Sequence, residues 1–476
     1  MVRYRKNFFL IILMASSLCF SISCSKKNPL SSPSDGEGKI DSEKISFTVT
    51  HDDSIPTAFL NYMAKMAEQN KHGIVQAIIT NNNKVPVQVR FSVKLDQYTD
   101  ESVQTVSVGA NGYTTVYSTP TISEDNLLKF NELKTVQCIV KATIINNDVE
   151  NNGNVFHNTY PIQMLAKDVW VFGKNKEYAP LIALWVTPHA PKVEELISKA
   201  KNYAINQQFI GYQQSEAKDG FKNYTEGITK TVTVSAESFI LGYEFTNPSL
   251  FTRNFTLSVN FSASGGSGND IITLLTLNNA KILYNSGQIH QGNFSKQITE
   301  DGYYELLFDN RFSYFTSKTV LYTSQINYDL DLVLEQVCAI YSALQKDYNI
   351  TYVSSTISFP QMNSQRVRFP NDALILGEAN CIDGTVLFAS ALENIGIEPL
   401  IVLVPGHSYV GWKRGTNSNK YEFLETTMIG TSNFIDAYNE GNRKYSNDFN
   451  VQRDIIIDVA YWRKQGVTPI MKQLIP

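Results

Sequence analysis

The sequence lacks the features that mark several common classes of protein. Its six histidines are scattered, and no two stand at the spacing of a metal-ligand pair, so no metal site is predicted. No glycine-rich run ends in Gly-Lys-Ser/Thr, which excludes a Walker-type phosphate loop, and Gly265–Gly268 is predicted to form a hairpin loop. We therefore expect neither a metal nor another cofactor.

Positive charge is also scarce. The chain has 41 Lys and Arg residues against 45 Asp and Glu residues, a net charge of −4. An N-terminal extension contains Arg3, Arg5 and Lys6, and its removal leaves a net charge of −7. Such a chain has no electrostatic basis for binding nucleic acid, so no nucleic-acid partner is expected.

Cysteine is rare as well, with five in the whole chain. Cys19 lies in an apolar leader and Cys24 follows it, which leaves Cys138, Cys338 and Cys381. An odd number of thiols in an exported protein leaves at least one free. Cys138 lies in a strand-like run and Cys338 on an apolar helical stripe, so both are expected to be inert core thiols. Cys381 has a different neighbourhood, described below.

The apolar run near the N-terminus is short. It covers residues 8–20 after a basic start, which is the pattern of a secretory leader and too short for a permanent membrane span. The residues before Cys24 resemble a bacterial lipobox, with Ser21 where Leu is usual. This resemblance implies a signal peptide over residues 1–23, lipidation of Cys24, a polar tether over residues 24–43, and a bacterial membrane anchor facing the periplasm or the cell surface. An ordinary cleaved signal or a signal anchor is the alternative.

The length of 476 residues predicts about three domains, because one core rarely serves more than about 250 residues. In residues 44–167, runs of alternating apolar and polar residues recur between turn-forming Asn and Gly clusters. This pattern predicts an antiparallel β-sandwich with an immunoglobulin-like outline. One helix is expected inside it, over Pro56–Gln69.

Residues 168–228 are predicted to be a helical connector that belongs to the C-terminal domain, because an apolar helical stripe begins at Val193. Strand-like alternation returns over residues 229–327, as in a domain inserted into a loop. Its segment Gly302–Asn310 resembles the final hairpin of GOLD domains, the β-sandwiches of Golgi cargo-sorting proteins. The resemblance implies a module that binds a protein or lipid partner. The alternative is a spacer sandwich in which Asp309 and Asn310 only build a turn.

Cys381 stands where a helix is predicted to begin. Asn380 is a good N-cap residue, an apolar stripe follows, and Gly396 fits the position just after the helix. A thiol acts as a nucleophile only as thiolate, and the unpaired N–H groups and dipole of a helix N-terminus favour that anion. The sequence therefore predicts an activated cysteine.

A hairpin downstream supplies the partners of this cysteine. A buried strand is predicted before Pro405-Gly406, which turns the chain. Two further strands then flank a polar loop. If that loop is centred near Thr416, residues whose numbers sum to 832 face each other, so His407 and Glu425 become cross-strand neighbours.

These residues fit the roles of a thiol mechanism. His407 takes the proton of Cys381 and returns one to the leaving group, while Glu425 orients the imidazole and stabilises its charged form. An oxyanion is expected to be held by the backbone N–H of Cys381 and by Gln365.

The C-terminal segment resembles bacterial transglutaminase-like domains of the papain-like cysteine superfamily. The motifs are Gln365-Arg-Val-Arg-Phe-Pro370, Asn380-Cys-Ile-Asp-Gly-Thr385, Gly406-His-Ser-Tyr-Val-Gly411 and Glu425-Thr-Thr427. The resemblance implies an α+β cysteine-hydrolase domain over residues 328–476, with Cys381 as nucleophile, His407 as base and Glu425 as third member. It departs from the family at Glu425, where Asp is usual. The expected fold is thus multidomain, with immunoglobulin-like and GOLD-like sandwiches and this α+β domain.

Two functions remain open from the sequence. The first is a membrane-anchored cysteine enzyme of the cell envelope that transfers acyl groups or hydrolyses amide bonds of a protein or peptide through a thioester. The second is a catalytically inactive transglutaminase-like scaffold that acts as an adhesin or protein-binding lipoprotein.

Overall fold

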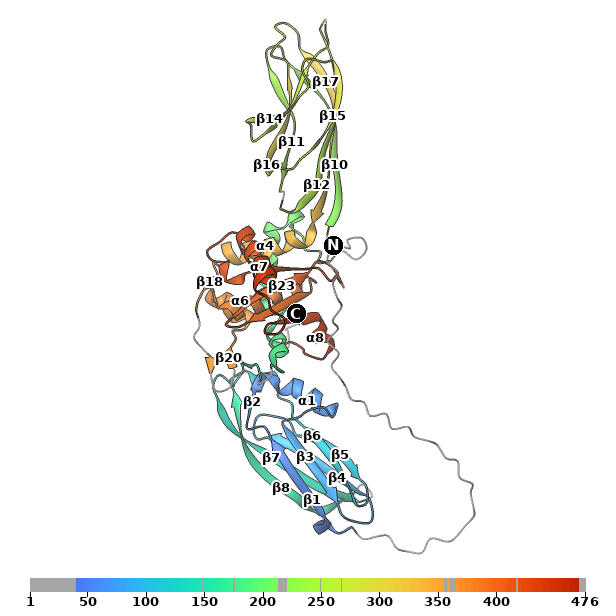
Figure 1. Cartoon of the computed structure of the whole chain (residues 1–476), viewed down its shortest axis with the longest axis vertical. Helices are drawn as coiled ribbons and strands as arrows, with labels where there is room; N and C mark the ends of the chain where they lie inside the picture. Colours follow the sequence, from blue (N-terminus) through green and yellow to red (C-terminus); the bar gives the residue numbers. More distant parts are fainter. Residues whose placement is uncertain are drawn as a thin grey trace, which may run out of the picture.

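The computed structural model describes residues 40–146, 149–173, 176–212, 221–248, 250–266, 268–354, 358–359, 364–416 and 418–470. The predicted signal peptide, Cys24 and most of the predicted tether lie outside these residues. None of the helices in the described ranges has the length and apolar character that a membrane span requires. Figure 1 shows an elongated molecule with a β-sandwich at each end and a mixed helix-and-sheet part between them.

The N-terminal sandwich consists of a three-stranded and a five-stranded sheet. The first holds β1 (Ile45–His51), β3 (Val75–Asn81) and β6 (Gly112–Ser118); the second holds β2 (Ser54–Pro56), β8 (Val149–Leu165), β7 (Lys134–Asn146), β4 (Val87–Leu95) and β5 (Ser102–Val108), in that order. Alternate residues of β4 from Val87 to Leu95 are fully buried, as the period-two pattern predicts. The predicted helix is present as η2 (Thr57–Phe59) followed by α1 (Leu60–Glu68).

The second sandwich, which we call the inserted sandwich, has two antiparallel sheets of four strands. These are β10 (Phe221–Val234), β17 (Lys318–Asp331), β12 (Thr252–Ser264) and β15 (Gln291–Gln297), and β11 (Phe239–Asn247), β16 (Gly302–Asp309), β13 (Ile272–Leu277) and β14 (Lys281–Asn285). Its strands extend past residues 229–327 at both ends. It has a core of its own, in which Leu257, Leu306 and Phe308 are fully buried.

Asp309 and Asn310 build the turn after β16. Asp309 accepts hydrogen bonds from the backbone N–H of Arg311 (2.9 Å) and from its guanidinium group. The buried Asn310 amide donates to the carbonyls of Val234, Ser235 and Thr316 at 3.2, 3.1 and 2.9 Å. Both side chains therefore have a structural role in this turn.

The middle part contains a four-stranded antiparallel sheet in the order β24 (Tyr421–Leu424), β23 (His407–Lys413), β22 (Pro399–Val404) and β25 (Ile455–Asp458). Helix α6 (Cys381–Asn394) packs against β22 and β23. The remaining helices are α3 (Pro191–Ala200), α4 (Leu332–Lys346), α5 (Pro370–Leu376), α7 (Phe434–Asp448) and α8 (Val459–Lys464). Because α3 packs against α4, α5 and α6, the chain leaves this part and returns to it through the inserted sandwich.

One hydrophobic core runs from the N-terminal sandwich into the middle part. Trp185, in η3 (Ala179–Trp185), is fully buried at the junction. Its ring lies 6.4 Å from that of Phe59 on one side and 6.4 Å from that of Phe369 on the other. The two parts are therefore packed together over apolar surface.

Arg414 ties the inserted sandwich to the hairpin of the middle part. Its guanidinium group pairs with Asp331, at the end of β17, and with Glu422 in β24. The two carboxylate side chains are 3% and 8% exposed. Asp331 also caps α4 by accepting from the Leu334 N–H at 3.0 Å.

Replacement of Arg414 by Met is expected to destabilise the middle part by about 3–5 kcal/mol, because it leaves two buried carboxylates without their cation. The measurement is the midpoint of urea unfolding, followed by tryptophan fluorescence. Arg443→Met is the control, since Arg443 is half exposed and pairs with Glu440 at the surface, where the loss of an ion pair changes stability little. Equal midpoints for the two variants would contradict the view that Arg414 stabilises the buried carboxylates of Asp331 and Glu422.

Candidate functional site

Cys381 is the first residue of α6. Asn380 caps the helix by accepting from the Asp383 N–H at 2.9 Å, and Asp383 accepts in return from the Asn380 N–H at 3.3 Å. Gly396 follows the helix with φ +78°, a conformation that favours glycine. The predicted cap and terminal glycine are confirmed, and the thiol stands at the positive end of a helix.

The turn at Pro405-Gly406 places His407. Val404 and His407 are paired residues of β22 and β23, so the turn has two residues. Pro suits its first position, and Gly406 adopts φ +75°, as the second position of a type II turn requires. The imidazole therefore stands at the first residue of β23, next to the N-terminus of α6.

The predicted register of the hairpin formed by β23 and β24 is wrong, because the sum of the paired residue numbers differs from the prediction by two. In β23 and β24, Val410 pairs with Leu424 and Lys413 with Tyr421, so paired numbers sum to 834 and not to 832. The reason is that the backbone N–H of Arg414 bonds to the Lys420 carbonyl at 3.1 Å, which centres the loop one residue later. Glu425 lies just beyond β24, where it caps η6 (Thr426–Met428).

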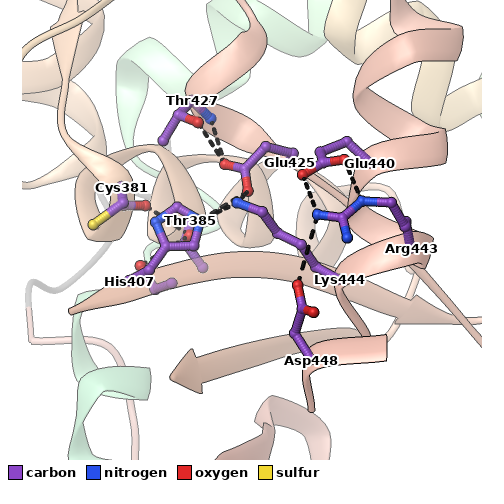
Figure 2. A network of polar contacts seen from close by, with 10 residues as sticks. Cys381, Thr385, His407, Glu425, Thr427, Glu440, Arg443, Lys444 and Asp448 are labelled. Atoms are coloured by element: carbon purple, nitrogen blue, oxygen red, sulfur yellow. Dashed lines mark hydrogen bonds and ion pairs between the residues drawn. The ribbon is translucent and has the colours of Figure 1, made fainter. Parts of the chain in front are cut away.

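Glu425 nevertheless reaches His407, diagonally across the hairpin (Figure 2). Its Oε2 lies 2.7 Å from Nε2 of His407, and its Oε1 accepts from the N–H and hydroxyl of Thr427 at 3.1 and 2.6 Å. Burial raises the pKa of Glu425, but the bonds from His407, Lys444 and Thr427 outweigh burial and bring this pKa to about 2. The carboxylate is thus charged and held in place.

The thiol and the imidazole influence each other. Burial raises the pKa of Cys381, yet hydrogen bonds from His407 and from the hydroxyl and N–H of Ser408 outweigh burial and leave the pKa below its ordinary value. Burial lowers the pKa of His407, while its bonds to Cys381 and Glu425 raise it to about 9. A thiolate–imidazolium pair is the state that these shifts favour.

Cys138 and Cys338 contrast with Cys381. All three are free thiols. Burial raises the pKa of Cys138 to about 12 and that of Cys338 to about 11. Among the three, only the pKa of Cys381 is lowered.

Lys444 is a member of the site that the sequence did not reveal. It lies on α7, and its Nζ is 2.7 Å from Oε2 of Glu425 and 3.2 Å from Nε2 of His407 (Figure 2). Lys444 and His407 therefore share one carboxylate oxygen, and the lysine charge lowers the pKa of His407. No motif or spacing connects position 444 with 407 and 425, so only the fold shows the contact.

Lys444→Met is expected to raise the pKa of His407 by about 1 pH unit, because Glu425 then serves the imidazole alone and a nearby positive charge is gone. The measurement is an NMR titration of the His407 ring in protein labelled at histidine. Arg443→Met, one residue away on the same helix, is the matched control and should leave that pKa in place. A His407 pKa in Lys444→Met equal to that of the wild type would refute this role.

A cavity of about 520 Å³ opens beside Cys381. Cys381, His407 and Gln365 are among its lining residues, whereas Glu425 lies behind His407. Gln365 is on β20 (Ser364–Arg366), so the predicted oxyanion residue shares a cavity with the thiol. In the described ranges no three His, Cys, Asp or Glu side chains are grouped in a way that could hold a metal ion.

Comparison with known proteins identifies the inserted sandwich. The family model described as emp24/gp25L/p24 family/GOLD matches residues 249–368, so the chain contains a GOLD-like β-sandwich. No curated protein matches the chain.

Two solved structures are similar to parts of the chain. One, from "Bacillus endospore appendages form a novel family of disulfide-linked pili", is 11% identical with a TM-score of 0.19, and the match covers 25% of this chain and 98% of the other. The other is the secreted serine protease VesC from Vibrio cholerae, 9% identical with a TM-score of 0.13, covering 52% and 45% of the two chains. Similarity at these TM-scores carries no argument about function.

Proposed function

We propose that the chain is a lipid-anchored protein of the bacterial cell envelope whose C-terminal part is a transglutaminase-like cysteine enzyme. Its reaction is acyl transfer or hydrolysis at an amide bond of a protein or peptide. The observation that carries the proposal is the contact of 2.7 Å between the partly exposed His407 and the buried Glu425, beside a cysteine at a helix N-terminus.

The reaction assigns one task to each group. The thiolate of Cys381 attacks the amide carbonyl, and the oxyanion accepts hydrogen bonds from the Cys381 N–H and from Gln365. His407 gives its proton to the leaving nitrogen as the C–N bond breaks, which leaves a thioester on Sγ. A water molecule or an amine then attacks the thioester, His407 takes the proton of that nucleophile, and the thiolate is released with the acyl product.

The surroundings of the pair support this proposal. Thr385 donates to the Cys381 carbonyl at 2.7 Å and lies 3.4 Å from the hydroxyl of Ser408. Glu425 has the longer side chain where the family usually has Asp. The 2.7 Å contact supports the view that this longer carboxylate fills the same role.

The pH dependence of alkylation tests the proposal. An ordinary thiol with a pKa of about 8.5 is only ~0.3% thiolate at about pH 6. The lowered pKa of Cys381 and the raised pKa of His407 favour the ion pair at a lower pH than an ordinary thiol would allow, and the pair is lost as the pH rises through about 9. We therefore expect iodoacetamide to label Cys381 at about pH 6 at more than about a tenth of its rate at about pH 8.

Glu425→Gln provides the matched variant, because it keeps the size of the side chain and removes its charge. Labelling of Cys381 at about pH 6 should fall on the order of tenfold, since the imidazolium loses its counter-charge. Mass spectrometry of the alkylated peptides gives each rate separately. A Cys381 rate that rises with pH like that of an ordinary thiol would remove the basis for an enzyme.

A second candidate function is that of an envelope adhesin or protein-binding scaffold that uses the GOLD-like sandwich. It is favoured by the loop between β16 and β17, at the end of the sandwich remote from Cys381, where Tyr314 is 70% and Phe315 95% exposed. Phe315→Ser is expected to abolish capture of a protein partner from envelope extract, and Cys381→Ala to retain it. Loss of capture in Cys381→Ala, together with loss of a trapped covalent adduct, would favour the enzyme instead.

A further inference from the structure

We infer that the cavity beside Cys381 binds an acyl donor through an uncharged, apolar or aromatic side chain, and that strand β9 (Val169–Val171) and the residue after it supply the recognising wall. This inference rests on the proposed function and narrows its substrate class.

The residues that line the cavity favour an uncharged ligand. Its large side chains are apolar or aromatic: Trp170, Phe172, Tyr352, Ile382, Leu403 and Val404. The other lining residues in the described part of the chain are small or polar, and none of these described residues is Asp, Glu, Lys or Arg. A charged substrate side chain would lose its water there without gaining an ionic partner, which is costly.

The charged residues of the site do not offset the cost of desolvating a charged substrate side chain. Glu425 and Lys444 are paired with each other at 2.7 Å and lie behind His407, outside the lining. The described residues of the cavity wall are therefore uncharged apart from the Cys381–His407 pair, which is used for the chemistry.

The size of the cavity fits one large side chain together with the reacting amide. Its volume of about 520 Å³ lies in the range of small-molecule sites, roughly 300–1,000 Å³. A Phe, Tyr or Trp side chain buries about 150–250 Å², which is the most apolar surface that a single residue offers.

The position of the aromatic wall is fixed by the pairing of β9 with β20 and by a hydrogen bond of Trp170. Strand β9 follows β8 closely, and Trp170 pairs with Gln365 of β20 in a small antiparallel sheet. Trp170 is 1% exposed and donates from Nε1 to the Tyr178 carbonyl at 3.3 Å. The Phe172 ring, 4.1 Å from that of Trp170, is only partly buried and is positioned to meet a ligand.

Blocked aminoacyl chloromethyl ketones that carry Phe, Leu, Lys or Glu side chains test the inference, because each alkylates the thiol only after its side chain is placed. Each rate is divided by the iodoacetamide rate of the same protein, which measures the thiolate and not recognition. We expect the Phe and Leu reagents to label Cys381 at least about tenfold faster than the Lys and Glu reagents.

Phe172→Asp should then reduce labelling by the Phe reagent and increase labelling by the Lys reagent. Tyr352→Asp, at a side chain that is 48% exposed, should shift the preference in the same direction without removing a core residue. Phe315→Asp, at the remote loop, is the control and should leave the preference in place.

Failure of this inference can be distinguished from failure of the proposed function. Equal relative rates for the four reagents, with Cys381 reactive at about pH 6, would overturn the inference and keep the proposed function. An ordinary thiol profile with iodoacetamide would overturn both. A preference that Phe172→Asp and Tyr352→Asp leave unchanged would show that another wall recognises the substrate, and would also overturn the inference.

Discussion

The candidate site depends on the buried carboxylate of Glu425. A carboxylate that is 1% exposed is stable only when its oxygens are hydrogen-bonded, and here His407, Lys444 and Thr427 provide the donors. These donors come from β23, α7 and η6. The backbone N–H of Glu425 also bonds to the Ala437 carbonyl of α7 at 3.0 Å. The hairpin, the short helix and α7 must therefore all be in place before the imidazole is oriented.

Local parts of this site could be predicted from the sequence, because each is encoded within a few residues. Asn380 as a cap and Pro405-Gly406 as a turn need no knowledge of the rest of the chain. The hairpin register was missed by two residues, since the loop after Lys413 is set by a backbone bond that composition does not specify. Lys444 was missed because it reaches the site only after α7 has packed against β24.

The same distinction applies to the fold. Alternation of apolar residues predicts the sandwich strands, because it reflects the two faces of each strand. The alternation does not predict that Phe59 and Trp185 join the N-terminal sandwich to the middle part through a common core. The sequence indicates only that each of these residues is buried. Nor does it predict the ion pairs of Arg414, whose partners Asp331 and Glu422 lie on different structural parts.

Under the proposed function, recognition and chemistry come from different parts of one packed body. The charged groups Glu425 and Lys444 lie behind His407, while the cavity in front of it presents Phe172 and other apolar side chains. An apolar substrate group that fills this cavity would displace water, which strengthens the attraction between thiolate and imidazolium but also disfavours both charged forms. The hydrogen bond from His407 to the buried Glu425 carboxylate opposes that cost on the imidazolium side, so the charged groups behind His407 allow the wall in front of it to be apolar.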